Sequence, residues 1–294
     1  MEGKIEKHES KRYERFILLD KSWINRMGVL DIIHGYTDIQ EFLAKQTNLS
    51  DDLLALKRAS ELWNTNSPID VGESGTLYRL LQFASWKLNL NKKFIKQGTL
   101  QGRSITNDQI IVNLGLEELL KLDNQTSQWA TASVLLGNEE RISNPPHKLQ
   151  QTFDAVDHWN KQRQVGLVWE SKYDETIQKQ AEAFLQLYTG SRPVFNPEHS
   201  EDYCFARVFG YMTKKEGEKM WSSLRGHETD RIEEMEKAIA QAEAGELIDS
   251  KDHRVVQAMT MWGMVNNKKL TFSHPEAVNK SWPQFWNFMK EISK

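Results

Sequence analysis

Polar clusters that directly precede apolar helical repeats constrain the fold of this chain more than any other feature. The clearest are 20–26 (DKSWINR), 70–79 (DVGESGTLYR), 224–232 (LRGHETDRI), 252–254 (DHR) and 278–283 (VNKSWP). Each places Lys, Arg, Ser, Thr or His where a repeat of helical period begins. A helix start offers free backbone N–H groups and about half a positive charge, so it can bind an anion. Several converging starts therefore predict a site for a small metabolite with several negative charges.

Composition indicates a soluble globular protein. The 294 residues suffice for one large domain or two ordinary ones. A formal net charge of −3 gives no general attraction to nucleic acid or membranes, so we expect neither as a partner. Residues 1–15 are charged and lack a signal peptide's hydrophobic core. The single cysteine, Cys204, excludes an internal disulfide and fits a reducing cytosol. We therefore expect a cytoplasmic protein, with Cys204 buried rather than nucleophilic.

Helical patterns dominate the chain, with short strand-like pieces between them. Helices are predicted over 22–34, 50–63, 75–88, 126–136, 149–163, 174–188, 202–214, 228–244, 252–265 and 281–292. Strand-like segments are 15–19, 93–98, 109–114, 166–170, 219–224 and 268–273. Helices that alternate with short strands predict a mixed α/β architecture. Three tryptophans, Trp262, Trp282 and Trp286, fall at helical spacing on apolar faces and are expected in the core.

In chain order, these clusters resemble the motifs of the enolpyruvyl transferases, most closely the 5-enolpyruvylshikimate-3-phosphate synthases. DKSWINR resembles the family's Lys-Ser-x-x-Asn-Arg start, and GESGTLYR resembles its Gly-x-x-Gly-Thr-x-x-Arg helix start. Further similar segments are 48–52, 98–105, 126–128, 142–146, 199–203, 227–231, 252–254 and 279–286. The ordered set extends from Lys21 to Lys280, so the resemblance rests on many motifs rather than on one.

The resemblance implies an α/β (α+β) fold with two domains. Each domain would be an inside-out α/β prism of βαβαββ units, with helices inside and sheets outside. Domain 21–164 would carry the acceptor site, and 1–20 with 165–294 would carry most of the phosphoenolpyruvate clamp. The chain is much shorter than the usual family member, so the prism would be truncated. Most of the residues that are missing relative to the family would fall between Arg103 and Thr126 and between Arg163 and Glu198.

The implied reaction transfers the enolpyruvyl group of phosphoenolpyruvate to a hydroxyl of shikimate 3-phosphate and releases phosphate. This is 3-phosphoshikimate 1-carboxyvinyltransferase chemistry, a step of the shikimate pathway to aromatic amino acids, and it requires no metal or organic cofactor. By resemblance, Arg231 and Arg254 would hold the carboxylate of phosphoenolpyruvate, since guanidinium groups pair with carboxylates through parallel hydrogen bonds. The full set that would bind phosphoenolpyruvate is Lys21, Gly75, Arg103, Gln128, Arg231, Arg254 and Lys280. Arg79 either joins this set or braces its helix.

The catalytic candidates are Lys21, Asp202 and Glu228. Asp202 would accept the proton of the attacking hydroxyl, and Glu228 or Lys21 would deliver one to the methylene carbon. Two carboxylates among cations can have pKa values pushed apart by their surroundings, which separates the two roles. Asp202 and Glu228 each precede an amphipathic stretch, so helix capping is an alternative that is also compatible with catalysis.

On the acceptor side, the resemblance assigns Ser22, Arg26, Thr126, Ser127, Ser143, Asp202 and His227. Arg26 would pair with the shikimate carboxylate, and the hydroxyls would donate to a phosphate. As isolated residues, the serines and the threonine would be ordinary helix caps. His253 is either structural or a hydrogen-bond donor to the ligand.

The chain departs from the family pattern mainly on this acceptor side. His227 occupies the position of a lysine in the family, Glu73 that of an asparagine, and Pro146 or His147 that of a tyrosine. Three hypotheses remain open. The chain is a shortened synthase, an enolpyruvyl transferase with another acceptor, or a non-catalytic binding protein whose exposed sheet edges meet a partner or a second copy.

Overall fold

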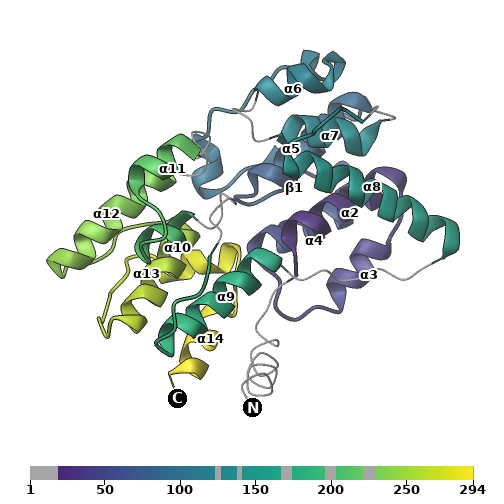
Figure 1. Ribbon diagram of the computed structural model, residues 1–294. Coiled ribbons are helices and arrows are strands. Elements are labelled where there is room, and N and C mark those ends of the chain that lie inside the picture. Colours follow the sequence, from purple (N-terminus) through teal and green to yellow (C-terminus); the bar gives the residue numbers. More distant parts are fainter. Residues whose placement is uncertain are drawn as a thin grey trace. The chain divides into compact units, whose positions relative to one another are not determined.

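The computed structural model describes residues 19–122, 127–137, 141–166, 174–195, 203–220 and 230–293. The chain divides into two compact units (Figure 1). The N-terminal unit comprises 20–172, and the C-terminal unit comprises 1–19 with 173–294. Across the described ranges, no helix is both long enough and apolar enough to cross a membrane.

The N-terminal unit is built on α2 (Lys21–His34), whose residues from Trp23 to Ile32 are all buried. Around it lie α3 (Asp38–Ala44), α4 (Asp51–Leu62), α5 (Gly75–Lys87), α6 (Leu116–Leu122), α7 (Gln128–Leu136) and α8 (His147–Val165). Short 3₁₀ helices, η2 (Gly98–Gly102) and η3 (Gln109–Asn113), follow α5. Strands β1 (Ile69–Asp70) and β2 (Phe94–Ile95) form a parallel pair, with Ile69 opposite Phe94. Helix α2 packs against α4 and α8, and α5 packs against α7.

Local chemistry explains why α2 begins and ends where it does. The Asp20 carboxylate accepts the backbone N–H of Trp23 at 3.0 Å and caps the helix. Gly35 ends it in the left-handed conformation, with φ of 76°. Within the helix, a Cβ on Gly28 would lie 2.8 Å from Leu56 Cδ2 and 2.9 Å from Ile39 Cγ1. The glycine therefore lets α3 and α4 approach α2 closely.

Asp31, fully buried on α2, joins three helices of the N-terminal unit. Its Oδ2 accepts the backbone N–H of Ile39 at 3.0 Å. Its Oδ1 accepts Trp159 Nε1 at 2.7 Å and Arg163 Nη2 at 2.5 Å. Arg163 also pairs with Asp38 at 2.7 Å. A buried carboxylate with these partners fixes α3 and the end of α8 against α2.

The C-terminal unit is arranged around α13 (His253–Val265). Its other elements are α9 (Glu175–Tyr188), α10 (Tyr203–Val208), α11 (Lys214–Met220), α12 (Arg231–Ala244), η6 (Pro275–Lys280) and α14 (Phe285–Ile292). Helix α13 packs against α9, α10, α12 and η6. Its face carries Val255, Val256 and Met259 into the apolar core. A parallel bridge, Ile248 to Phe272, joins the segments that follow α12 and α13.

The predicted α/β prism of βαβαββ units is wrong. The strands found in the described ranges are β1 and β2, which have two residues each and pair only with each other, so no outer sheet forms there. Segment 93–98 gives only β2, 109–114 forms η3, and 268–273 contributes one bridge. Ile95 and Ile110 remain 48% and 61% exposed. Short apolar runs form strands only where a neighbouring strand accepts their hydrogen bonds, and periodicity alone does not reveal that neighbour. Residues 15–18, 167–170 and 221–224 lie outside the described ranges.

The helix predictions are confirmed for most segments. The exceptions have local causes. Predicted helix 202–214 is interrupted after α10, where Gly210 has φ of 72°, and a separate α11 follows. The last helix begins at Phe285 rather than at residue 281, since Pro283 interrupts the backbone hydrogen bonds. Helices α3 and α6 were not predicted. Of the three tryptophans expected in the core, Trp282 is fully buried and Trp262 is partly buried against the core. Trp286 is 37% exposed and donates to Pro275 O.

Candidate functional site

The starts of α12 and α13 meet around one buried carboxylate, Asp252, in the C-terminal unit. Its Oδ1 accepts the backbone N–H of Arg254 at 2.9 Å and caps α13. Its Oδ2 accepts Arg231 Nε, from the first position of α12, at 2.8 Å. Asp252 is 1% exposed, Arg254 2% and Arg231 8%. Asp252 thus accepts hydrogen bonds from the Arg231 side chain and from the Arg254 backbone, the two arginines that the resemblance assigned to a carboxylate ligand.

Further buried polar groups surround α13. Arg254 Nη1 donates to Gln180 Oε1 of α9 at 3.4 Å. Gln257 Nε2 donates to Ser281 Oγ at 3.0 Å, while Gln257 Oε1 accepts no hydrogen bond from the described residues. His253 on α13 and Lys280 at the end of η6 are also buried, and η6 packs against α13. We call Arg231, Asp252, His253, Arg254 and Lys280 the Asp252 centre. Sequence reasoning missed Gln180 and Gln257, which lie in the middle of their helices and belong to no motif.

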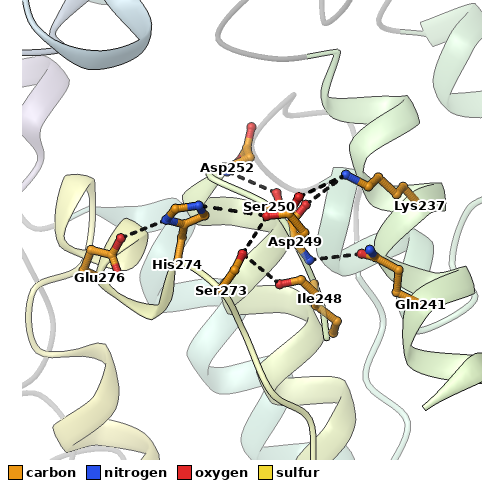
Figure 2. A network of polar contacts seen from close by, with 9 residues as sticks. All are labelled: Lys237, Gln241, Ile248, Asp249, Ser250, Asp252, Ser273, His274 and Glu276. Atoms are coloured by element: carbon orange, nitrogen blue, oxygen red, sulfur yellow. Dashed lines mark hydrogen bonds and ion pairs between the residues drawn. The ribbon is translucent and has the colours of Figure 1, made fainter. Parts of the chain in front are cut away.

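An exposed polar network fixes the segment between α12 and α13 that carries Asp252. Figure 2 shows Lys237 and Gln241 of α12 directed at Asp249. Gln241 Oε1 accepts the Asp249 N–H at 3.1 Å, and Lys237 Nζ donates to Asp249 O at 3.2 Å. Ser273 Oγ donates to Asp249 Oδ1 at 2.7 Å. This hydrogen bond, with the Lys237 charge, lowers the pKa of Asp249. Asp249 is therefore held to α12 by Lys237 and Gln241, and to the chain before η6 by Ser273.

The same network extends to His274 and to the cap itself. His274 Nε2 lies 4.0 Å from Asp249 Oδ1, and its Nδ1 lies 3.1 Å from Glu276 Oε1 (Figure 2). At the other end, Ser250 Oγ accepts the Asp252 N–H at 3.2 Å. The cap of α13 is therefore positioned by hydrogen bonds on the Asp249 side as well as by Arg231.

A second cluster lies at the start of α5 in the N-terminal unit. Arg79 Nη1 donates to Gly75 O at 3.3 Å and to Gln128 Oε1 at 2.6 Å. Gln128 Nε2 donates to Thr76 Oγ1 at 3.1 Å, so the starts of α5 and α7 meet. A Cβ on Gly75 would lie 2.8 Å from Arg103 Nη1 and 3.2 Å from Arg79 Nη1. Glycine at this position therefore lets two guanidinium groups lie against the helix start.

Glu73 belongs to this second cluster. Thr99 Oγ1 donates to Glu73 Oε2 at 2.9 Å, and Arg103 Nη2 donates to Thr99 Oγ1 at 2.9 Å. Gly98 has φ of +47°, and a Cβ there would lie 1.7 Å from Glu73 Oε1. We call Glu73, Gly75, Arg79, Arg103 and Gln128 the Gly75 centre. Thr99 was missed by sequence reasoning because a lone threonine carries no signal.

The start of α2 has a different environment. Lys21 Nζ pairs with Asp52 of α4 at 3.0 Å, and Ser22 is half-buried beside it. The buried Arg26 guanidinium donates to Thr152 Oγ1 at 2.8 Å, to Ser22 O at 2.8 Å and to Lys148 O at 3.0 Å. Arg26, expected to pair with a shikimate carboxylate, here ties α2 to α8.

Some of the remaining predicted site residues lie within the described ranges and others do not. Ser127 is buried directly before α7, with φ of 56°, and Ser143 is exposed. Thr126, Asp202, His227 and Glu228 lie outside the described residues, as does the side chain of His147.

Cys204 is buried in α10, as predicted. Burial raises the pKa of its thiol, and the negative charge of Asp252 raises it further. A neutral, inaccessible thiol is not a nucleophile.

One surface hollow of the N-terminal unit lies away from the predicted residues. It has a volume of about 480 Å³ and is lined by Trp86, Lys87, Asn89, Gln109, Ile110, Val112 and Asn113. None of these was assigned to a site, so the hollow adds nothing to the two centres.

Comparison with family models, with curated proteins and with solved structures finds no match for this chain. Its chemistry must therefore be argued from its own residues. Both centres offer cationic donors at helix starts, which bind carboxylate and phosphate groups through charge-assisted hydrogen bonds.

Proposed function

We propose that this chain is a cytoplasmic enolpyruvyl transferase that moves the enolpyruvyl group of phosphoenolpyruvate to the hydroxyl of shikimate 3-phosphate. One observation carries the proposal. Residues far apart in the sequence that share an implied role in binding phosphoenolpyruvate also share a cluster. Arg231 Nε and the Arg254 backbone N–H both donate to Asp252. Arg103 lies against Gly75 at the start of α5, and Gln128, at the start of α7, donates to Thr76 Oγ1 of α5.

Under this proposal, each centre offers cations to one kind of anionic group. In the C-terminal unit, Arg231 and Arg254 of the Asp252 centre would hold a carboxylate. In the N-terminal unit, Arg103 and Gln128 of the Gly75 centre would hold a phosphate group, together with Lys21. Burial supports these roles, because a charge-assisted hydrogen bond is stronger where water is excluded.

The chemistry proceeds in two stages. A proton adds to the methylene carbon of phosphoenolpyruvate from Glu228 or Lys21, and the acceptor hydroxyl attacks the adjacent carbon as Asp202 takes its proton. The tetrahedral intermediate then loses a proton from its new methyl group and expels phosphate, which restores the carbon–carbon double bond. Fixed cations favour the second stage, because negative charge collects on the departing phosphate.

A specific observation favours a second candidate, an enolpyruvyl transferase with another acceptor. Glu73, where the resemblance leads us to expect an asparagine, contacts Arg103 through Thr99. An added negative charge there changes which ligand groups the Gly75 centre accepts. The third hypothesis, a non-catalytic binding protein, stays a prediction, although its argument from exposed sheet edges does not apply to the described ranges, whose paired strands have only two residues each.

The proposal is tested by incubating the purified chain with phosphoenolpyruvate and shikimate 3-phosphate and measuring released phosphate. We expect release, with a loss of at least a hundredfold in Arg254→Gln and in Asp202→Asn. Lys290→Gln removes an exposed positive charge from α14 in the same unit and should leave the rate unchanged. Absence of release, or equal rates in Arg254→Gln and the unaltered chain, contradicts the proposal. Phosphoenolpyruvate binding without turnover of shikimate 3-phosphate would favour the second candidate.

A further inference from the structure

The carboxylate of Glu73 is built into the Gly75 centre rather than left in solvent. Thr99 Oγ1 donates to Glu73 Oε2 and accepts from Arg103 Nη2, both at 2.9 Å. The hydroxyl therefore has a fixed direction, with its proton toward the carboxylate and its lone pair toward the guanidinium. Glu73 and Arg103 are thereby held one hydroxyl apart.

The backbone is shaped to accept this carboxylate. Gly98 has a positive φ of +47°, and any Cβ would overlap Glu73 Oε1, at 1.7 Å, and Cδ, at 2.3 Å. Both features require glycine at this position. The carboxylate consequently lies against the Gly98 backbone, beside the start of α5.

Glu73 therefore lowers the positive charge of the centre without cancelling it. Arg79 and Arg103 lie against Gly75, where the start of α5 adds about half a positive charge. Glu73 opposes them with one negative charge. Any anion that Arg103 binds must approach this carboxylate, and the repulsion it meets is proportional to its own charge.

We propose that Glu73 is a specificity-determining residue that weakens the binding of doubly charged anions at the Gly75 centre more than that of singly charged ones, such as carboxylates. The inference rests on the anion-binding role of Arg103 in the proposed function, but it does not require catalysis. It explains why Glu73 is held through Thr99 and why Gly98 is a glycine.

The test compares sulfate, a dianion, with formate, a monoanion, at constant ionic strength. Dissociation constants are obtained from the shift of the thermal midpoint with anion concentration. With Glu73 about 8 Å from the bound anion and partly screened, Glu73→Gln should tighten formate binding by about threefold. Sulfate binding should tighten by about tenfold, since the repulsion that is removed is twice as large.

Two controls locate the effect. Glu117→Gln removes the same charge from the exposed face of α6 in the same unit and should change neither constant by more than about twofold. In an Arg103→Gln background, Glu73→Gln should no longer alter sulfate binding. Equal gains for both anions, no gain, or no sulfate binding by either protein would overturn the inference. A chain that fails to release phosphate from phosphoenolpyruvate but shows the tenfold gain would retain it, so the two proposals fail separately.

Discussion

Replacing Asp252 tests how much the stability of α12 and α13 depends on the carboxylate that pairs with the buried Arg231. Asp252 has two roles, since Oδ2 binds Arg231 Nε and Oδ1 caps α13 through the Arg254 N–H. Asparagine caps a helix about as well as aspartate. Asp252→Asn therefore removes the negative charge and keeps the cap, whereas Asp252→Ala removes both.

The expected magnitude follows from burial. The Asp252 side chain is 0% exposed and that of Arg231 is 9% exposed, so loss of the carboxylate leaves a buried cation. Removing one partner of such a pair costs about 3–5 kcal/mol, and we expect about 3 kcal/mol for Asp252→Asn because Arg231 retains some solvent contact. Loss of the cap adds about 1 kcal/mol, so Asp252→Ala should cost about 4 kcal/mol.

Hydrogen exchange is the appropriate assay, because a chain with two units need not unfold in one step. The opening free energy of amides in α12 and α13 should fall by these amounts, while that of amides in α2 should not change. Sulfate should restore part of the loss in Asp252→Asn, since an anion can replace the missing charge. A change below about 1 kcal/mol in Asp252→Asn would refute the reasoning.

Four further predictions concern stability and reactivity. Asp31→Asn should lower the opening free energy of α3 by about 3 kcal/mol, because Asp31 is buried with Arg163, and exchange of α3 amides measures it. Gly217→Ala should destabilise α11 by about 2 kcal/mol, since its Cβ would lie 2.2 Å from Tyr203 Cε2. Gly35→Ala, with φ of +76° and open space, should cost only about 1 kcal/mol of backbone strain in urea unfolding. Cys204 should resist iodoacetamide at pH 8 until the chain unfolds. Because burial raises its pKa, stability should fall as pH rises above about 8.5, where only the unfolded thiol ionises; an equally rapid reaction in the folded chain would contradict this.

Helix positions could be predicted because their signals are local. Asp174 and Gly190 bound α9 as expected, since the Asp174 carboxylate accepts the Ile177 N–H at 3.0 Å and Gly190 has φ of 87°. The same holds for Gly245 after α12. Sheets could not be predicted in this way. A strand needs a partner elsewhere in the chain, and segment 109–114, apolar but without one, coils into η3.

The sequence identified the members of the two centres but not their contacts. Arg231 and Arg254 were expected together because each lies in a motif, yet nothing in the sequence shows that Asp252 joins them. Arg26 has a motif position too, and its guanidinium bonds to α8. Motif membership therefore indicated which residues are buried and charged. Which of these charged side chains contact one another depends on how the helices pack, and the sequence alone does not reveal that packing.

The pair formed by Asp252 and Arg231 is not explained by stability alone. A buried ion pair is often no more stabilising than apolar residues of similar size, because both charges lose their hydration. Arg231→Met with Asp252→Asn removes both charges and keeps the cap, so it should recover most of the stability lost in Asp252→Asn. If it does, and sulfate no longer stabilises the double variant, the two charges serve ligand binding. If the double variant is as unstable as Asp252→Asn, the pair is structural, and the Asp252 centre needs no ligand to account for its buried charges.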